Sequence, residues 1–443
     1  MGRTILFSPV GGTDPISATN VFDGSLLHIC RFYKPDKVVL YMSAEVLKLQ
    51  EEDDRYRYCL KRLLDLQNRE MEIESIERPE LTEVQDFDFF YDDFRDVLKK
   101  VYANLKEDDE LLLNVSSGTP AMKSTLMVLG TFGEIPCRLI QVATPVRKMN
   151  EHQHKNYDVA TLWELDEDNN DNAENRCSEI QCPSLLMLKQ EEMIKQHLIV
   201  YDYRAALTIT ESMPSAYTKS YLKLLKIADF RQQLLPSEVD KICNPLGINV
   251  FPVRDGNKRK CFEYALMLQN KLARKEYADF IRGISPLLKD LFELILMNQC
   301  GTDINRFTSD RNGMKQWDKN KLTVNDPKVT TIFNCLSQSF RNSNYTPVYS
   351  SALRDIIDKM SSDSSLKQVV GDLRDVESKV RNLAAHEIVS ITADTIRSLT
   401  GLTPEQIMRK IKTAFTYAGM NIRSEQWKSY DYMNQQIIDA MAH

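Results

Sequence analysis

Residues 110–123, Glu-Leu-Leu-Leu-Asn-Val-Ser-Ser-Gly-Thr-Pro-Ala-Met-Lys, join a short apolar run to a helix start. The apolar run has the length of a buried strand and ends at Asn114 and two serines. Thr119 followed by Pro120 is typical of a helix start, because threonine caps the first turn and proline needs no N–H there. The stretch therefore predicts a buried strand that enters a helix through a turn of small residues.

The same alternation of strand and helix extends over the first 165 residues. Further strands are expected at residues 4–7, 37–43, 71–76 and 138–143, with helical stretches between them. This order is typical of a Rossmann-like parallel sheet with helices on both faces. Beyond about residue 184 the apolar periodicity predicts one helix after another. The expected fold class is therefore α/β plus all-α.

Composition shifts set the expected domain boundaries. Residues 166–176 read Asp-Glu-Asp-Asn-Asn-Asp-Asn-Ala-Glu-Asn-Arg, which indicates a linker or an exposed loop. In the helical part, Ser285 is expected to cap a helix with Pro286 at its first position, and residues 302–328 to form a loop. The predicted organisation is an α/β domain (1–165), an acidic linker or loop (166–178), a helical connecting region (179–270) and a helical domain (271–443).

Charge and cysteine content limit the possible functions. The 443 residues carry a formal net charge of −6, so any contact with RNA must be local, and stable DNA binding is not expected. The nine cysteines include no C-x-x-C pair, which favours reduced thiols and no metal site. No apolar run has the length of a membrane span, and the chain begins directly with a strand pattern, so a cytoplasmic protein is expected.

Two small-residue turns form a candidate anion site. The turn after residue 115 lies at the carboxyl end of a strand, where open α/β sheets bind ligands, and a helix start offers free N–H groups to an anion. A comparable turn follows the first strand. The alternative is a pair of ordinary, well-capped strand-to-helix turns. The candidate residues are Gly11, Gly12, Thr13, Ser116, Ser117, Gly118, Thr119 and Lys123.

A second candidate site lies near the end of a helix predicted from apolar positions between residues 366 and 384. Arg381, Asn382 and His386 follow within two turns. Histidine transfers protons near neutral pH, arginine holds a phosphate, and asparagine can fix a phosphate oxygen. The alternative is an ordinary solvated helix face, and the spacing is also met by Arg147 with His152 and His154.

Together these stretches resemble a known family. Residues 114–123 resemble a CRISPR-associated Rossmann fold (CARF) domain, and Arg381-Asn382 with His386 resembles the motif of HEPN ribonucleases. Their order is similar to that in the stand-alone ribonucleases of type III-A CRISPR systems. The resemblance implies a homodimer whose CARF domains bind one cyclic oligoadenylate, with the six-adenylate ring favoured over the four-adenylate ring.

The resemblance also implies a chemistry. Arg381, Asn382 and His386 of both subunits would form one HEPN site that cuts single-stranded RNA without a metal or another cofactor. The ribose 2′-hydroxyl would attack in line and leave a 2′,3′-cyclic phosphate. The CARF domain would also cleave its activator slowly, with Thr13 or Thr119 orienting a ribose. A nucleotide-sensing regulatory or interaction protein without nuclease activity remains an alternative, as does a metal-dependent nuclease.

Overall fold

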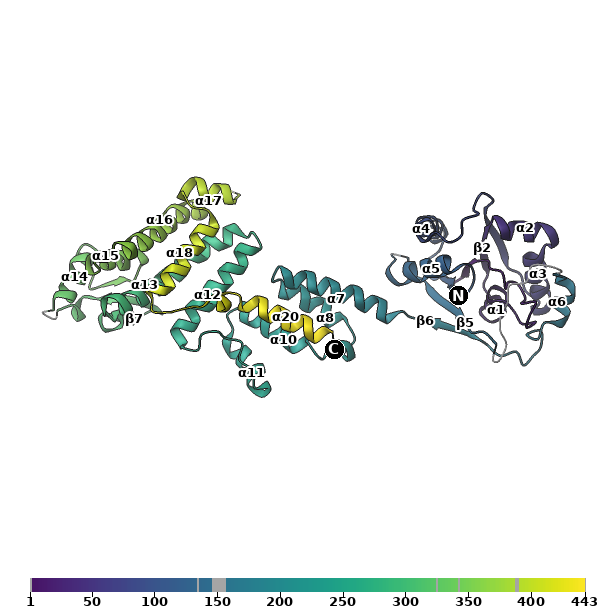
Figure 1. The fold of residues 1–443 in the computed structure, drawn as a ribbon, viewed down its shortest axis with the longest axis horizontal. Coiled ribbons are helices and arrows are strands. Elements are labelled where there is room, and N and C mark those ends of the chain that lie inside the picture. The colour runs from purple at the N-terminus through teal and green to yellow at the C-terminus, as the bar shows by residue number, and fades with distance from the viewer. Residues whose placement is uncertain are drawn as a thin grey trace. The chain divides into compact units, whose positions relative to one another are not determined.

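The computed structural model describes residues 2–133, 135–145, 157–323, 326–341, 343–386 and 390–442, with only the backbone of residues 380–386. The chain divides into two compact units, Met1–Lys189 and Gln190–His443. Figure 1 labels many of the elements of each unit. Among the described residues, no helix combines the length and the apolar character that a membrane span requires. The nine cysteines are all free thiols.

A six-stranded sheet forms the centre of the first unit within the described residues, in the order β3-β2-β1-β4-β5-β6. Neighbouring strands are parallel, except that β6 runs antiparallel to β5. The prediction of a Rossmann-like sheet is thus confirmed. The strands are β1 (Thr4–Pro9), β2 (Lys37–Ser43), β3 (Glu72–Arg78), β4 (Glu110–Asn114), β5 (Arg138–Val142) and β6 (Cys177–Ile180).

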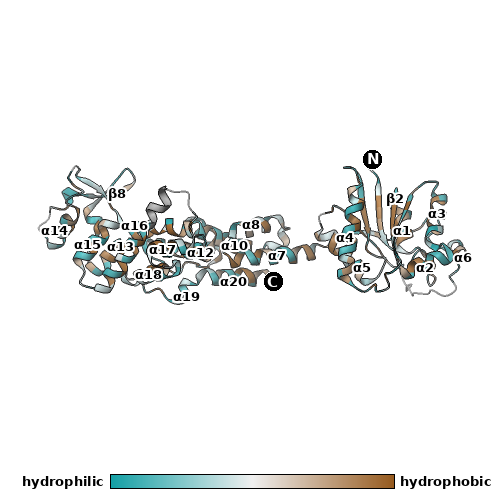
Figure 2. Cartoon of the chain, turned by 90° about the horizontal axis from the view of Figure 1, so that it is seen from above, coloured by the Kyte–Doolittle hydropathy of each residue, from teal (hydrophilic) through white to brown (hydrophobic). Residues whose placement is uncertain are grey.

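Helices cover both faces of this sheet because successive strand residues point to opposite sides. Leu6 packs into the core below one face, whereas Ile5 and Phe7 pack into the core below the other. Figure 2 shows apolar residues along the strands between the helices. The first core is closed by α1 (Ser25–Tyr33), α2 (Ala44–Asp53), α3 (Arg55–Gln67) and α6 (Val159–Leu165), and the second by α4 (Phe87–Ala103) and α5 (Pro120–Phe132).

The acidic stretch 166–178 is not a linker between the two units. It lies within the first unit and ends in β6, which pairs with β5. Asp166 and Asp168 are only 5% and 2% exposed, and they pair with Arg31 and Arg176. The expectation of an interdomain linker is wrong because the stretch packs within the first unit, but the other three acidic residues of 166–176 are exposed, as the alternative of an exposed loop predicted.

The second unit is mainly helical, as predicted. The boundary between the units falls inside α7 (Pro183–Ile199). The further helices are α8 (Tyr203–Ser212), α9 (Ser215–Thr218), α10 (Leu222–Gln232), α11 (Pro236–Leu246), α12 (Gly256–Ala273), α13 (Tyr277–Cys300), α14 (Pro327–Leu336), α15 (Ser350–Met360), α16 (Ser364–His386), α17 (Ala393–Thr400), α18 (Pro404–Tyr417), α19 (Ser424–Trp427) and α20 (Ser429–Met441).

Two local predictions in the second unit are wrong. Ser285 does not cap a helix, because α13 runs continuously through Ser285 and Pro286. Residues 302–328 are not merely a loop, since they contain two strands of a small sheet, formed in the order β7-β8-β9. These strands are β7 (Thr308–Arg311), β8 (Met314–Asp318) and β9 (Tyr345–Pro347), with short 3₁₀ turns η1 (Ile304–Phe307) and η2 (Lys319–Lys321) beside them.

The apolar stripe predicted for α16 is confirmed over its described side chains. Leu366, Val370, Leu373 and Val376 are at most 1% exposed. Their face packs against α13, α15 and α18. The helix is therefore held by its apolar spacing, and its last turns carry the candidate nuclease residues.

Candidate functional site

The carboxyl ends of β1 and β4 bring the two predicted turns together. These strands are parallel neighbours at the point where the strand order reverses, which is the usual ligand-binding place of such sheets. The Ser117 hydroxyl donates a hydrogen bond to the Asp14 carboxylate. A Cβ added to Gly11 would lie 2.8 Å from the amide nitrogen of Gly118, so the two turns touch through their main chains.

Asp14 holds the first turn in place. Its side chain accepts hydrogen bonds from the N–H groups of Gly11 and Leu26, both at 3.0 Å. The residue is 2% exposed, and this burial raises the pKa of its carboxyl above the ordinary value. The sequence pattern did not single out Asp14, although aspartate is one of the residues that favour turns by bonding nearby main-chain groups.

Asn114 holds the second turn. Its fully buried side chain donates to the hydroxyls of Ser8 at 2.9 Å and Ser25 at 3.1 Å, and it accepts from the N–H of Ser116 at 3.0 Å. The Ser116 hydroxyl in turn accepts from the N–H of Val142 at 2.8 Å, which ties the turn to β5. The position of the turn is therefore fixed from three strands and α1.

Gly118 and Thr119 form the entry into α5. Gly118 has a φ of +86°, a conformation that favours glycine. The Thr119 hydroxyl accepts from the N–H of Met122 at 3.3 Å and donates to the carbonyl of Val84 at 2.7 Å. Pro120 takes the first helical position, so the predicted capping is confirmed.

This arrangement leaves main-chain donors for an anion. Among the hydrogen bonds of the described residues, none uses the N–H of Gly12, Thr13, Gly118 or Thr119. The hydroxyls of Ser117 and Thr119 are already engaged inside the protein. Backbone N–H groups before a helix start attract phosphate oxygens. The positively charged side chain of Lys123, which is half-buried, lies one turn into α5. An anion would therefore be recognised mainly through the main chain.

A buried cluster behind this site has the residue types of a metal centre. Single ligand atoms of Asp23, His28 and Asp168 lie within 4.8 Å of one another. The guanidinium of Arg31 donates to both oxygens of Asp23, and Arg176 donates to Asp168 and, through its main chain, to Nε2 of His28. The cluster is accordingly a structural ion network that fastens residues 166–176 to α1.

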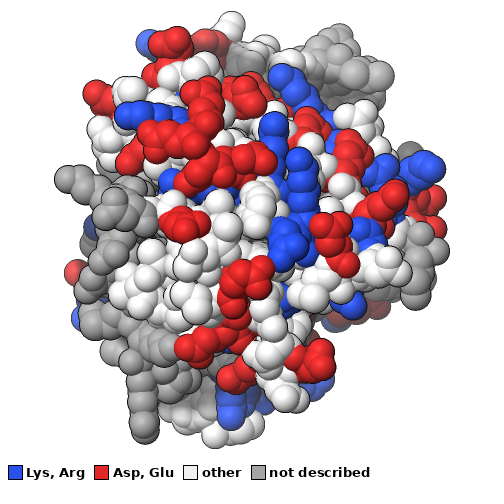
Figure 3. Space-filling model, turned by 90° about the vertical axis from the view of Figure 1, so that its right-hand side faces the viewer, with Lys and Arg blue, Asp and Glu red and all other residues white. Residues whose placement is uncertain are grey.

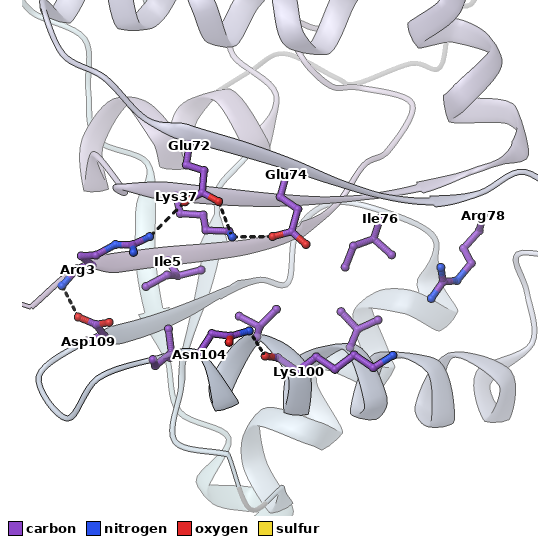
Figure 4. A pocket seen from close by; sticks show the side chains of 13 residues that line it. Arg3, Ile5, Lys37, Glu72, Glu74, Ile76, Arg78, Lys100, Asn104 and Asp109 are labelled. Atoms are coloured by element: carbon purple, nitrogen blue, oxygen red, sulfur yellow. Dashed lines mark hydrogen bonds and ion pairs between the residues drawn. The ribbon is translucent and has the colours of Figure 1, made fainter.

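A groove of about 520 Å³ at the opposite end of the strands offers no comparable anion site. Figure 4 shows Lys37 bridging the carboxylates of Glu72 and Glu74, at 2.7 and 2.6 Å. Arg78, which also lines the groove, pairs with Asp93 at 2.8 Å. On the face drawn in Figure 3, acidic and basic groups are interspersed, with no continuous basic field.

The candidate nuclease residues lie in the last two turns of α16. The backbone of Arg381, Asn382 and His386 is helical up to the end of α16 at His386, and their side chains lie outside the described residues. The alternative matches to the spacing, formed by residues 147, 152 and 154, also lie outside the described residues. The geometry of the candidate nuclease site is thus defined only at the level of the backbone.

Family models match three parts of the chain. The Cas_Csm6 CARF domain matches residues 72–177, the Csm6 6H domain residues 180–232, and the Cas_Csm6 HEPN domain residues 250–438. The sequence predicted no motif for the region that corresponds to the 6H domain.

Sequence similarity to known proteins covers nearly the whole chain. The CRISPR system endoribonuclease Csm6 of Mycobacterium tuberculosis (strain ATCC 25618 / H37Rv) is 31% identical over 98% of both chains. Csm6 of Streptococcus thermophilus is 29% identical over 98% of this chain and 99% of its own. The structure of Enterococcus italicus Csm6 bound to cyclic hexa-2′-fluoro-hexa-dAMP has a TM-score of 0.68 at 21% identity, covering 99% of this chain and 100% of that one. This chain therefore belongs to the Csm6 family of CRISPR-associated endoribonucleases with CARF and HEPN domains.

Proposed function

We propose that a cyclic oligoadenylate binds the first unit and activates RNA cleavage by the second. The observation that carries this proposal is the contact between the turns after β1 and β4, with its unused N–H groups. A cyclic oligoadenylate presents one phosphodiester anion for each nucleotide, and such anions suit main-chain donors. The ligand named with the E. italicus relative has six nucleotides, which supports a six-membered ring here.

The proposed active form is a homodimer. A ring with twofold symmetry can contact the same pair of turns, Gly11 to Thr13 and Ser116 to Thr119, in each of two copies of the chain. The ring activates only if it binds the active arrangement of the dimer more tightly than the inactive one. Each copy then contributes Arg381, Asn382 and His386 to one composite site.

The proposed reaction needs only these side chains. The ribose 2′-oxygen attacks the adjacent phosphorus, the bond to the 5′-oxygen breaks, and the products are a 2′,3′-cyclic phosphate and a 5′-hydroxyl. His386 transfers the proton as general acid or base, and Arg381 stabilises the charge on the pentacoordinate phosphate. Asn382 orients a phosphate oxygen.

Slow cleavage of the activator in the first unit is a further part of the proposal. The Thr119 hydroxyl is held by Val84 and by the start of α5, so Thr13 is the better candidate for orienting a ribose of the ring. The RNA assay described next also follows the ring and tests this step.

The test is RNA cleavage with four- and six-adenylate rings, with and without EDTA, following both RNA and ring. Cleavage should require a ring, persist in EDTA and disappear in His386→Ala, whereas ring binding should be retained. His197→Ala is the matched control, because His197 is a partly exposed histidine of α7. Ring binding without RNA cleavage by the unaltered chain would favour the alternative, a regulatory protein.

A further inference from the structure

A carboxylate lies buried on the apolar face of α16. Glu377 is 6% exposed and follows Val376 on the face that packs against the neighbouring helices. It precedes Arg381 by four residues in the same helix, which corresponds to roughly 6 Å along the axis. The carboxylate therefore lies one turn before the candidate nuclease residues.

Both oxygens of this carboxylate are engaged by other helices. The Ser285 hydroxyl of α13 donates to Oε1 at 2.5 Å, and the Ser350 hydroxyl at the start of α15 donates to Oε2 at 2.6 Å. Arg374, one turn earlier in α16, lies 3.6 Å from Oε2. Three helices thus meet at one carboxylate, which we call the Glu377 clamp, formed by Glu377, Ser285 and Ser350.

The clamp is costly if its only purpose is stability. Burying a carboxylate requires desolvation, and apolar side chains of similar size often stabilise a core at least as well. Leu373 and Val376 show that apolar packing already holds this face. Two directional bonds from two different helices, however, fix the rotation and the axial position of α16, which apolar contacts leave freer.

The surroundings of Ser285 support this interpretation. Pro286 lies inside α13 and has no N–H to donate, so the regular bonding of α13 is interrupted next to Ser285. The hydrogen bond to Glu377 supplies a defined contact at that point.

We propose that Glu377 is a positioning residue for RNA cleavage. The clamp fixes α16 against α13 and α15 immediately before Arg381, Asn382 and His386. The last turns of the α16 backbone, which carry these residues, are thereby held at a defined position. The inference rests on the proposed nuclease function of α16.

The test compares Glu377→Ala and Glu377→Gln in the full chain, activated by cyclic hexa-adenylate. The alanine variant should lower kcat for RNA cleavage about 10- to 100-fold, because small misplacements of reacting groups have effects of this order. The KM for RNA and the affinity for the ring should be the same as in the unaltered chain. Glutamine can still accept from one serine and donate to the other, so it should restore most of kcat.

Asp372→Ala is the matched control. Asp372 also lies on α16 and forms a 2.7 Å ion pair with Lys410 of α18, but it is one-third exposed and lies further from Arg381. This variant should keep the kcat of the unaltered chain. If Glu377→Ala fails to fold, the variants Ser285→Ala and Ser350→Ala test the proposal instead, because each removes one hydrogen bond of the clamp. Each should lower kcat without changing KM.

Two results would overturn the inference. One is an unchanged kcat in Glu377→Ala or in both serine variants. The other is a loss of activity that matches the loss of folded protein, measured by thermal unfolding, without rescue by glutamine. His386→Ala separates the inference from the function on which it rests. If that variant still cuts RNA, the proposed nuclease site has failed; if it is inactive while Glu377→Ala is normal, only the clamp has failed.

Discussion

Replacing Gly118 with alanine tests whether the contact between the two turns shapes the activator site. Gly118 has a φ of +86°, and an added Cβ would lie 2.8 Å from the sulfur of Met122 and 2.9 Å from Cβ of Pro9. The side chain of Met122 can move, but Pro9 is part of the end of β1. The added methyl group therefore pushes the two turns apart.

The magnitude follows from two contributions. A non-glycine residue in the left-handed region costs about 1–2 kcal/mol, and overpacking costs typically about 1–3 kcal/mol. Because Met122 can relieve part of the clash, we expect the free energy of unfolding of the first unit to fall by about 2–4 kcal/mol. A loss of about 1.4 kcal/mol of binding energy from the displaced N–H groups would weaken ring binding tenfold.

The assay is urea unfolding followed by circular dichroism, combined with calorimetric titration of cyclic hexa-adenylate. Gly401→Ala provides the control for the backbone contribution. Gly401 has a similar φ of +81°, and nothing lies within 4 Å of its added Cβ. It ends α17 in the second unit, so its substitution should destabilise that unit without affecting ring affinity.

The reasoning would be refuted by a Gly118→Ala protein with the stability and the ring affinity of the unaltered chain. It would also be refuted if Gly401→Ala weakened ring binding to the same extent. In either case the close approach of the two turns would have no bearing on the activator site.

Three further predictions concern the network around the site and its chemistry. Asn114→Ala removes the bonds to Ser8 and Ser25, and should lower the free energy of unfolding by about 1–3 kcal/mol and weaken ring binding, as measured by urea unfolding and calorimetry. Burial and the neighbouring Asp23 carboxylate raise the pKa of Asp166. The folded state therefore holds the carboxyl proton of Asp166 more tightly than the unfolded state does. The stability that this proton adds is fully present below about pH 4, where the carboxyl is protonated in both states, and it is lost as the pH rises through the folded pKa. Asp166→Asn should flatten this decline in unfolding measurements at a series of pH values, and an unchanged slope would contradict the assignment. Ring-activated RNA cleavage should proceed at the same rate after exhaustive EDTA treatment, whereas a loss that added Mg²⁺ restores would indicate a metal-dependent site.

Local signals were sufficient for the first five strands of the sheet and for the helical character of the second unit, but not for β6 or for the small sheet of β7, β8 and β9. The alternation of apolar strands and helices in residues 1–165 predicted the parallel sheet, because strand and helix periodicities are properties of neighbouring residues. Thr119 and Pro120 marked the start of α5 for the same reason. The apolar spacing of α16 identified its buried face, and the small-residue turns marked the sheet edge that we propose as the activator site.

Contacts between distant residues required the tertiary structure. Ser117 and Asp14 are 103 residues apart, Arg31 and Asp166 are 135 apart, and Ser285 and Glu377 are 92 apart. Composition indicated a linker or an exposed loop, whereas the fold buries two carboxylates of this stretch beside arginines. The sequence by itself determined the strands with strong apolar runs, the helical character of the second unit and the turns that carry small residues. Only the tertiary structure decided which buried polar groups satisfy one another, because a hydrogen bond depends on positions in space that separation along the chain does not encode.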